Sequence, residues 1–128
     1  MEDCHQMSQS EKWTVIFGPT FKAWLSDQPR EVQVRMLQSI RLLQQVGPNL
    51  ARPYADTVQG SKFSQMKELR VQIAGRPFRA FYAFDPLRQA VVLCAGNKTG
   101  KGRFYAEMIS LADNEFDKYL TNLATHHE

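Results

Sequence analysis

Three strand-like segments in succession, joined by two short turns, restrict the folds open to this chain more than any other feature. Residues 66–73 alternate between apolar and polar side chains, whereas residues 78–84 and 90–95 are apolar on both faces, as central strands are. The second turn opens with Asp85 and has Pro86 in its second position. Because turns this short join neighbouring antiparallel strands, the sequence predicts an antiparallel meander. Its first strand places Leu69, Val71 and Ile73 on one face and Glu68, Arg70 and Gln72 on the other.

Helical patterns flank the meander on both sides. The strongest lies within residues 27–47, where Asp27 is a candidate N-cap and Gly47-Pro48 is a stop signal. A short strand over residues 13–17 and a short helix capped by Thr20 precede it, and an amphipathic helix from residue 103 or 104 to 123 ends the chain. The expected fold class is therefore α+β, a small twisted antiparallel β-sheet with two N-terminal helices packed on it and a C-terminal helix. The predicted buried stripe of the long helix is Val32, Met36, Ile40, Leu43 and Val46.

The 128 residues are enough for one domain with its own core. We expect a polar leader over residues 1–12, a single domain over residues 13–125 and a tail over residues 126–128, with residues 48–62 as a connection rich in turn residues. The leader lacks the apolar stretch of a signal peptide, and no segment reaches the length of a transmembrane helix. Cys94 lies in an apolar run and is expected to be a buried free thiol. These features predict a cytoplasmic protein without a membrane partner.

Charge is distributed unevenly along the chain. Residues 61–103 carry a net charge of +7, although the whole chain carries only +3, and residues 104–128 carry −4. The basic segment coincides with the predicted strands. A positive face on a small sheet is a natural binding surface for phosphates and above all for nucleic acid, although an ordinary solvated face remains an alternative.

Several of these cations are expected to meet at one end of the sheet. The strand with Lys67 and Arg70 pairs with the strand that carries Arg79. The third strand ends in a glycine-flanked basic loop over residues 96–102, and the last helix opens directly afterwards. The loop lacks the Gly-Lys-Ser/Thr ending of a nucleotide-binding P-loop and follows an antiparallel strand, so it is not interpreted as one. The side chains expected to converge are Lys67, Arg70, Arg79, Lys98, Arg103, Phe104 and Tyr105.

Such a cluster can cleave RNA without a metal ion. The three histidines lie in the two tails, which excludes a paired-histidine ribonuclease unless a tail folds back, and no spacing of metal ligands occurs, so no metal or other cofactor is expected. Arginine can stabilise the charge that develops when the 2′-hydroxyl attacks phosphorus. Neighbouring cations are expected to lower the pKa of a Lys or Tyr that takes the proton from the 2′-hydroxyl or gives one to the leaving 5′ oxygen. We also expect Phe104 or Tyr105 to be exposed, so that its ring can stack on a base. In the simpler alternatives, Arg70 pairs with Glu68 and Tyr105 is a packing residue.

Four motifs in order give the chain a resemblance to a known family. They are Lys-Glu-Leu-Arg from residue 67, Gly-Arg-Pro-Phe-Arg from residue 75, Tyr-Ala-Phe-Asp-Pro from residue 82 and Gly-Asn-Lys-Thr-Gly from residue 96. Over about residues 13–123 the sequence resembles the phage-derived Gp49-like, HigB-type branch of the RelE/ParE toxin superfamily. The resemblance implies a RelE-like fold and the toxin of a type II toxin–antitoxin system. It further implies a metal-independent endonuclease that cleaves mRNA bound to the ribosome. A cognate antitoxin with a helix-turn-helix domain would silence this toxin, and the toxin would contact DNA only indirectly, through the antitoxin.

The resemblance also implies roles for individual residues. Arg79 matches the strand arginine that contacts the scissile phosphate, and Tyr105 matches an aromatic acid–base or stacking residue. Ser110, Phe116 and Tyr119 depart from the family pattern, and the last of them stands where a histidine is common. The implied catalytic residues are Arg79, Lys98, Arg103 and Tyr105, and the implied RNA-binding residues are Lys67, Arg70, Arg76, Lys101 and Phe104.

Two other functions compete with mRNA cleavage. A ParE-like protein would inhibit DNA gyrase without cleaving nucleic acid, and it would need no such cluster of cations. A non-catalytic nucleic-acid-binding module would show binding with a steep salt dependence but no cleavage. The cations together with Tyr105 favour the endonuclease. We also expect the antitoxin to cover the basic site with an acidic or apolar segment.

Overall fold

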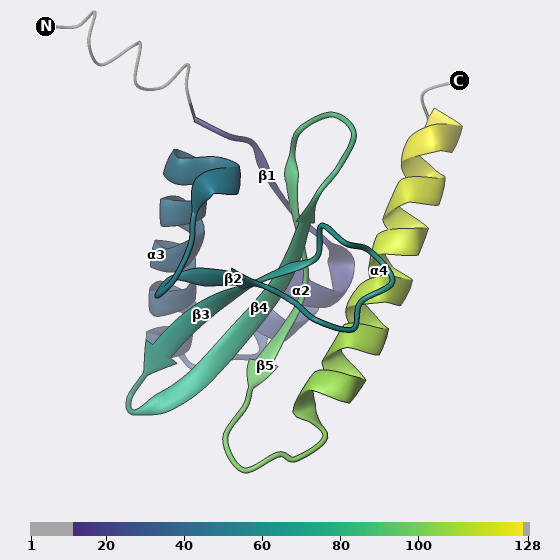
Figure 1. Cartoon of the computed structure of the whole chain (residues 1–128). Helices are drawn as coiled ribbons and strands as arrows, with labels where there is room; N and C mark the ends of the chain where they lie inside the picture. The colour runs from purple at the N-terminus through teal and green to yellow at the C-terminus, as the bar shows by residue number, and fades with distance from the viewer. Residues whose placement is uncertain (1–11, 127–128) are drawn as a thin grey trace, which may run out of the picture.

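The predicted meander forms the centre of the molecule. In the computed structural model, which describes residues 12–126, strands β3 (Lys67–Ile73), β4 (Arg76–Phe84) and β5 (Ala90–Asn97) pair antiparallel in this order (Figure 1). The register places Arg70 opposite Arg79 and Arg79 opposite Gly96. The α+β fold class with two N-terminal helices and a C-terminal helix is confirmed. Residues 1–11 of the predicted leader, with Cys4 and His5, and the last two residues of the tail lie outside the described residues.

Two short strands extend the meander at its edges. β1 (Val15–Phe17) pairs in parallel with β5, and β2 (Ala55–Thr57) pairs antiparallel with β3, so the order is β1-β5-β4-β3-β2 and the sheet is mixed. The parallel pairing of β1 was not predicted, and the segment that contains β2 was expected to be a connection only. Strands of three residues carry too little periodicity to reveal either pairing from the sequence.

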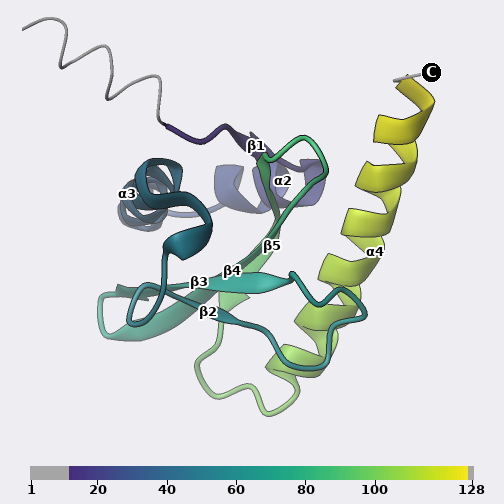
Figure 2. The same cartoon turned by 45° about the horizontal axis from the view of Figure 1, so that its top comes forward.

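The helices divide between the two faces of the sheet. Helices α2 (Pro19–Ser26) and α3 (Arg30–Val46) cover one face, while α4 (Phe104–His126) lies on the other side and packs against β5 and β4 (Figures 1 and 2). The predicted stripe of α3 is buried except at Val46, which is 37% exposed. Cys94 is buried and unpaired, as predicted, and burial raises the pKa of its thiol to about 12. The first core cluster includes Phe21, Met36, Leu43, Leu69, Val71 and Ile73, and the second includes Met66, Phe81, Leu93, Phe104 and Phe116.

The predicted starts of α2 and α3 are wrong, because neither helix begins at a residue whose side chain caps it. α2 begins at Pro19 after Gly18, so Thr20 is not its N-cap, and Asp27 is the C-cap of α2 and not the N-cap of α3. The stop at Gly47 is confirmed: its φ is 74°, and a Cβ there would lie 2.2 Å from the Trp13 indole nitrogen. A short 3-10 helix, η1 (Gly47–Asn49), follows. α4 runs three residues beyond the predicted end at residue 123, to His126.

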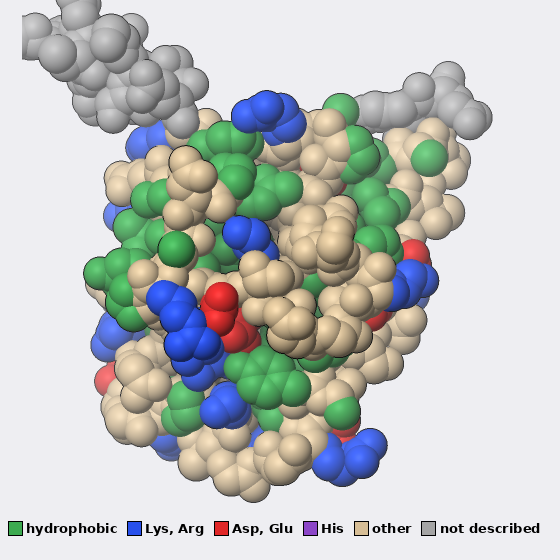
Figure 3. Space-filling model, viewed as in Figure 1, with side chains coloured by type: hydrophobic (Ala, Val, Ile, Leu, Met, Phe, Trp, Pro, Cys, Tyr) green, Lys and Arg blue, Asp and Glu red, His purple; other side chains and the backbone are tan. Residues whose placement is uncertain are grey.

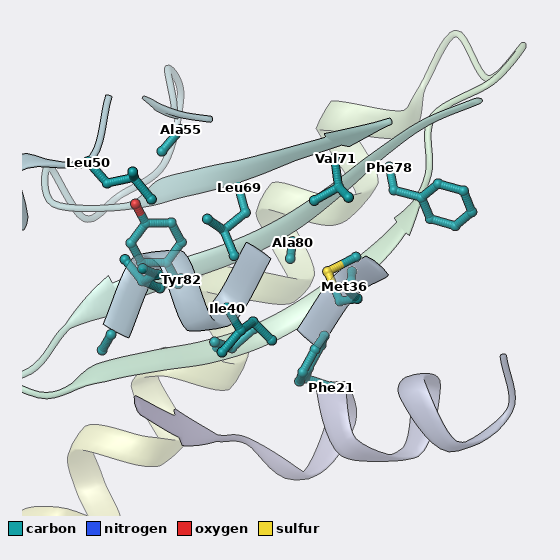
Figure 4. Close-up of a cluster of buried hydrophobic side chains, with 14 of the residues drawn as sticks. Phe21, Met36, Ile40, Leu50, Ala55, Leu69, Val71, Phe78, Ala80 and Tyr82 are labelled. Carbon is teal, nitrogen blue, oxygen red and sulfur yellow. The ribbon is translucent and has the colours of Figure 1, made fainter. Parts of the chain in front are cut away.

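The hydroxyl of Tyr82 supports a prediction about stability. Tyr82 is fully buried, its hydroxyl points toward Leu50 and has no hydrogen-bond partner among the described residues (Figure 4). Because an unpaired buried hydroxyl costs roughly 1–3 kcal/mol, we expect Tyr82→Phe to raise the free energy of unfolding by about 1 kcal/mol in urea denaturation. Tyr119→Phe is the matched control, since the Tyr119 hydroxyl donates to Asp85 at 2.7 Å, and it should lower stability by about 1 kcal/mol. Equal destabilisation by both variants would contradict the prediction.

Candidate functional site

The candidate site lies on the face of β3 and β4 that α2 and α3 do not cover. Residues of even number in β3 and of odd number in the first half of β4 point to this face, because side chains alternate along a strand. The antiparallel register sets Arg70 beside Arg79, and Glu68 lies two residues before Arg70 on the same face. The first turn of α4 adds Tyr105 from above the sheet. Three elements therefore bring one carboxylate, two guanidinium groups and one phenol together.

A buried carboxylate links these groups. The Tyr105 hydroxyl donates to Glu68 Oε1 at 2.7 Å, and Arg79 Nε donates to the Tyr105 oxygen at 3.1 Å and lies 3.7 Å from Glu68 Oε1. Arg70 Nη1 donates to Glu68 Oε2 at 2.9 Å. Arg79 Nη1 also donates to the backbone oxygen of Phe78 at 3.0 Å. Glu68 and Arg79 are only 4% and 6% exposed, so the guanidinium of Arg79 is held in one orientation by fixed acceptors.

The protonation of Tyr105 differs from the sequence-based expectation. Neighbouring cations were expected to lower the pKa of a phenol at this position. Instead, burial and the hydrogen bond to Glu68 raise the pKa of Tyr105, and the opposing effect of Arg79 is smaller. Tyr105 is therefore a protonated hydrogen-bond donor at neutral pH. The expectation that Arg70 pairs with Glu68, noted as the simpler alternative, is confirmed.

An open pocket lies directly beside this network. It has a volume of about 260 Å³ and is lined by Arg52, Pro53, Arg70, Gln72 and Arg79. Arg52 comes from the segment before β2, and its guanidinium pairs with Asp56 at 2.8 Å on the surface. In the view of Figure 3, Lys and Arg side chains gather around acidic ones over β2 and β3. The pocket thus offers three guanidinium groups to an anion, a ligand class to which their planar, permanently charged forks are suited.

Sequence reasoning missed Arg52 as a member of the site. The residue lies in a connection that is joined to the sheet by the pairing of β2 with β3 and by the bond from Arg70 N–H to the Tyr54 carbonyl. No local motif marks that pairing. The sequence suggested Glu68 only as a partner of Arg70. The alternation of side chains along β3 could have placed it next to Arg79, because it puts Glu68 on the face opposite to that of Leu69.

The other predicted residues do not join this network. Lys67 shares the face of Leu69, donates to the Pro48 carbonyl at 3.3 Å and lines a different pocket with Trp13 and Phe84, so its predicted convergence is wrong. Phe104 is 4% exposed, which corrects the expectation of an exposed stacking ring. Arg103 is exposed and pairs with Glu107 at 3.8 Å. Lys98 is half-buried at the end of β5, where its N–H bonds to the Pro77 carbonyl, and Arg76 and Lys101 line a further cavity.

The positions that depart from the family pattern, Ser110, Phe116 and Tyr119, all lie in α4. Phe116 is fully buried in the second core cluster. Tyr119 donates to Asp85 at the far end of β4, so it stabilises the fold at a distance from Arg79. Burial opposes ionisation of Asp85, but hydrogen bonds from Tyr119, Gln89 and Leu87 outweigh it and lower the pKa of the carboxyl group. The burial of Tyr119 and its bond to this carboxylate raise the pKa of the phenol.

Two further features of the described residues concern metal ions and membranes. Residues 12–126 hold no group of three or more His, Cys, Asp or Glu side chains that could bind a metal ion. Within the same residues no helix combines the length and the apolar character needed to cross a bilayer.

This fold and site define a small single-sheet α+β protein with a preorganised arginine–tyrosine cluster on an open sheet face. The chain belongs to the family of phage-derived Gp49-like proteins, whose sequence profile matches residues 23–117. It is 44% identical over 100 residues to a Mycobacterium tuberculosis protein named "Putative toxin HigB2", and this match covers 77% of the chain and 50% of that relative. It is 38% identical over 109 residues to "Putative toxin HigB3" of the same organism, covering 84% of the chain and 94% of that relative. The chain therefore spans about half the length of the first relative and nearly all of the second. The HigB-type resemblance read from the four motifs is confirmed.

Proposed function

We propose that this protein is the toxin of a type II toxin–antitoxin system and acts as a metal-independent, ribosome-dependent mRNA endonuclease in the cytoplasm. The observation that carries the proposal is the network of Glu68, Arg79 and Tyr105 beside a pocket lined by three arginines. The names of the two relatives support the toxin class. The cleavage chemistry rests on what these side chains can do.

In this reaction the 2′ oxygen of the RNA attacks the adjacent phosphorus and the 5′ oxygen leaves. The 2′-hydroxyl loses its proton, the 5′ oxygen gains one, and the products are a cyclic phosphate and a free 5′-hydroxyl. Arg79 stabilises the negative charge that accumulates on the phosphoryl oxygens, because its guanidinium is already oriented before RNA arrives. Tyr105 stays protonated, and its single O–H donates to Glu68 in the free protein. In the proposed reaction this hydrogen turns from Glu68 to the leaving oxygen and supplies it with a proton or a hydrogen bond.

We assign the remaining cations either to binding the RNA on both sides of the cleaved bond or to charge stabilisation. Arg52 and Arg70 line the pocket with Arg79 and are placed to hold neighbouring phosphates. Lys98 directly follows β5, and Arg103 directly precedes α4, whose second residue is Tyr105. We assign both cations to the charge stabilisation expected of the catalytic set. Arg76 and Lys101 are assigned to RNA binding at the end of the sheet.

The proposed partners are mRNA on the ribosome and a helix-turn-helix antitoxin. We infer that the antitoxin silences the toxin by covering the arginine-lined pocket with an acidic or apolar segment. A complex in which the antitoxin leaves Arg52, Arg70 and Arg79 exposed would overturn this direct masking.

Primer extension on mRNA from cells that briefly express the protein tests the function. We expect growth arrest with discrete breaks inside translated reading frames, and neither effect from an Arg79→Ala, Tyr105→Ala double variant. Plasmid supercoiling is measured in the same cells. Growth arrest with intact mRNA and relaxed plasmid would instead establish gyrase inhibition, and tight, salt-sensitive RNA binding without breaks would establish a binding module.

A further inference from the structure

A second cavity lies at the end of β5, outside the network just described. β1 pairs with β5 only as far as Val92, so Ala95–Asn97 forms a free edge beyond it. The cavity has a volume of about 530 Å³ and lies between the end of α2 and the start of α3 on one side and the first turns of α4 on the other. None of the roles assigned to the arginine-lined pocket uses it.

The apolar part of this cavity is aromatic and shaped to remain open. Phe78 and Phe104 are buried and form its inner surface, and Trp24, half-buried, forms a wall with its ring centroid 6.2 Å from that of Phe78. Gly96 lies between them on β5. A Cβ at Gly96 would lie only 3.1 Å from the Phe104 ring, so any larger residue would push that ring and change the cavity. Aromatic walls of this kind accept a flat ring by stacking or edge contact.

The polar part supplies one donor and one acceptor from amides. Asn97 Oδ1 already accepts the Thr99 N–H at 3.0 Å, so its NH₂ group is what it can offer a ligand. Gln28 donates through Nε2 to the Trp24 carbonyl at 3.2 Å, so its Oε1 is the acceptor it can offer. Both amides line the same cavity, and a donor together with an acceptor is what the hydrogen-bonding edge of a nucleobase requires.

Charge at the mouth of the cavity favours a phosphate. Arg76 and Lys101 line it and are exposed, and Glu107, the one carboxylate in its lining, lies 3.8 Å from Arg103 on its own helix. We propose that this cavity is a nucleotide subsite that takes one unpaired base of the RNA, with its phosphate on Arg76 and Lys101, and that it sets the base preference of cleavage. The proposal rests on the proposed function, because the base that the cavity takes belongs to the RNA proposed to be cleaved at Arg79, which lies opposite Gly96 of the cavity in the register of β4 and β5.

The two tryptophans provide the test. Trp24 lines the cavity, while Trp13 packs against Phe84 at the opposite end of the sheet with centroids 5.6 Å apart. In a titration of ¹⁵N-labelled protein with each of the four nucleoside 5′-monophosphates, we expect the Trp24 indole resonance to shift and that of Trp13 to stay. One base should bind roughly tenfold more tightly than the weakest, as one good set of edge hydrogen bonds gives. Lys101→Glu should weaken binding roughly tenfold, and Lys118→Glu, an equal change at an exposed site on α4, should leave it unchanged.

Three outcomes would overturn the subsite. They are no shift of Trp24, an equal shift with inorganic phosphate alone, or a Trp24 shift caused by the helix-turn-helix partner protein but by none of the nucleotides. Nucleotide binding and mRNA cleavage, both measured with the wild-type protein, separate this proposal from the proposed function. Retained nucleotide binding at Trp24 without mRNA cleavage by the wild type would reject the endonuclease and keep the site, whereas cleavage without binding would do the reverse.

Discussion

Arg79→Ala is expected to lower the rate of mRNA cleavage by roughly 10²–10³ in a reconstituted translation reaction, the usual cost of removing one oriented donor to a developing charge. The structure gives a reason for a large effect. The guanidinium is 6% exposed, its orientation is fixed by Tyr105 and by the Phe78 carbonyl, and it lines the pocket expected to hold the phosphate. Affinity for RNA should fall much less, because Arg52 and Arg70 line the same pocket.

A conservative variant makes this prediction sharper. Arg79→Lys retains the charge but loses the planar fork, so its rate should stay far below that of the wild type. Arg70→Lys serves as the matched control on the neighbouring strand, since Arg70 is more exposed and should act mainly in binding. Thermal unfolding of each variant shows whether it is folded. Cleavage by folded Arg79→Lys at the wild-type rate would remove Arg79 from the catalytic role.

Local sequence information was enough to place the two central arginines. The tight turn after β3 fixes the register of the hairpin, and the register alone sets Arg70 opposite Arg79. The same alternation argued against Lys67, which shares the face of Leu69 and lies about 10 Å along the strand from Arg70 at roughly 3.3 Å per residue. The sequence alone could therefore have shown that Lys67 does not lie beside Arg70 and Arg79.

Other parts of the site depend on long-range packing that no short motif records. Arg52 reaches the pocket because a three-residue strand adds to the edge of the meander. Whether Phe104 or Tyr105 faces the arginines depends on the rotation of α4 about its axis, since consecutive helical residues point in different directions. The rotation buries Phe104 in the core and directs Tyr105 to Glu68. The raised pKa of Tyr105 follows from that placement and reverses the expectation based on net charge.

Glu68 connects both arginines to Tyr105, and its substitution is the second change with a large expected effect. Glu68→Ala should lower the free energy of unfolding by about 3 kcal/mol, because it leaves the buried guanidinium of Arg79 without a carboxylate. Glu107→Gln is the control, since its pair with Arg103 is exposed on both sides and should contribute less than about 1 kcal/mol. Urea denaturation of the purified variants measures both.

Glu68→Gln distinguishes a purely structural role for this carboxylate from one in positioning. Glutamine has nearly the same shape and can still accept a hydrogen bond, but it carries no charge. The bond to Glu68 helps to raise the pKa of Tyr105, so spectrophotometric titration of the variant should show one tyrosine titrating at lower pH than in the wild type. Because the folded-state pKa of Tyr105 is raised, its contribution to stability is complete below about pH 10 and is lost as the pH rises, and the loss should be smaller in the variant. If cleavage falls together with this pKa while the variant stays folded, Glu68 acts by holding Arg79 and Tyr105 in place. Full cleavage with an altered tyrosine titration would show that the orientation of Tyr105 is not needed for the reaction.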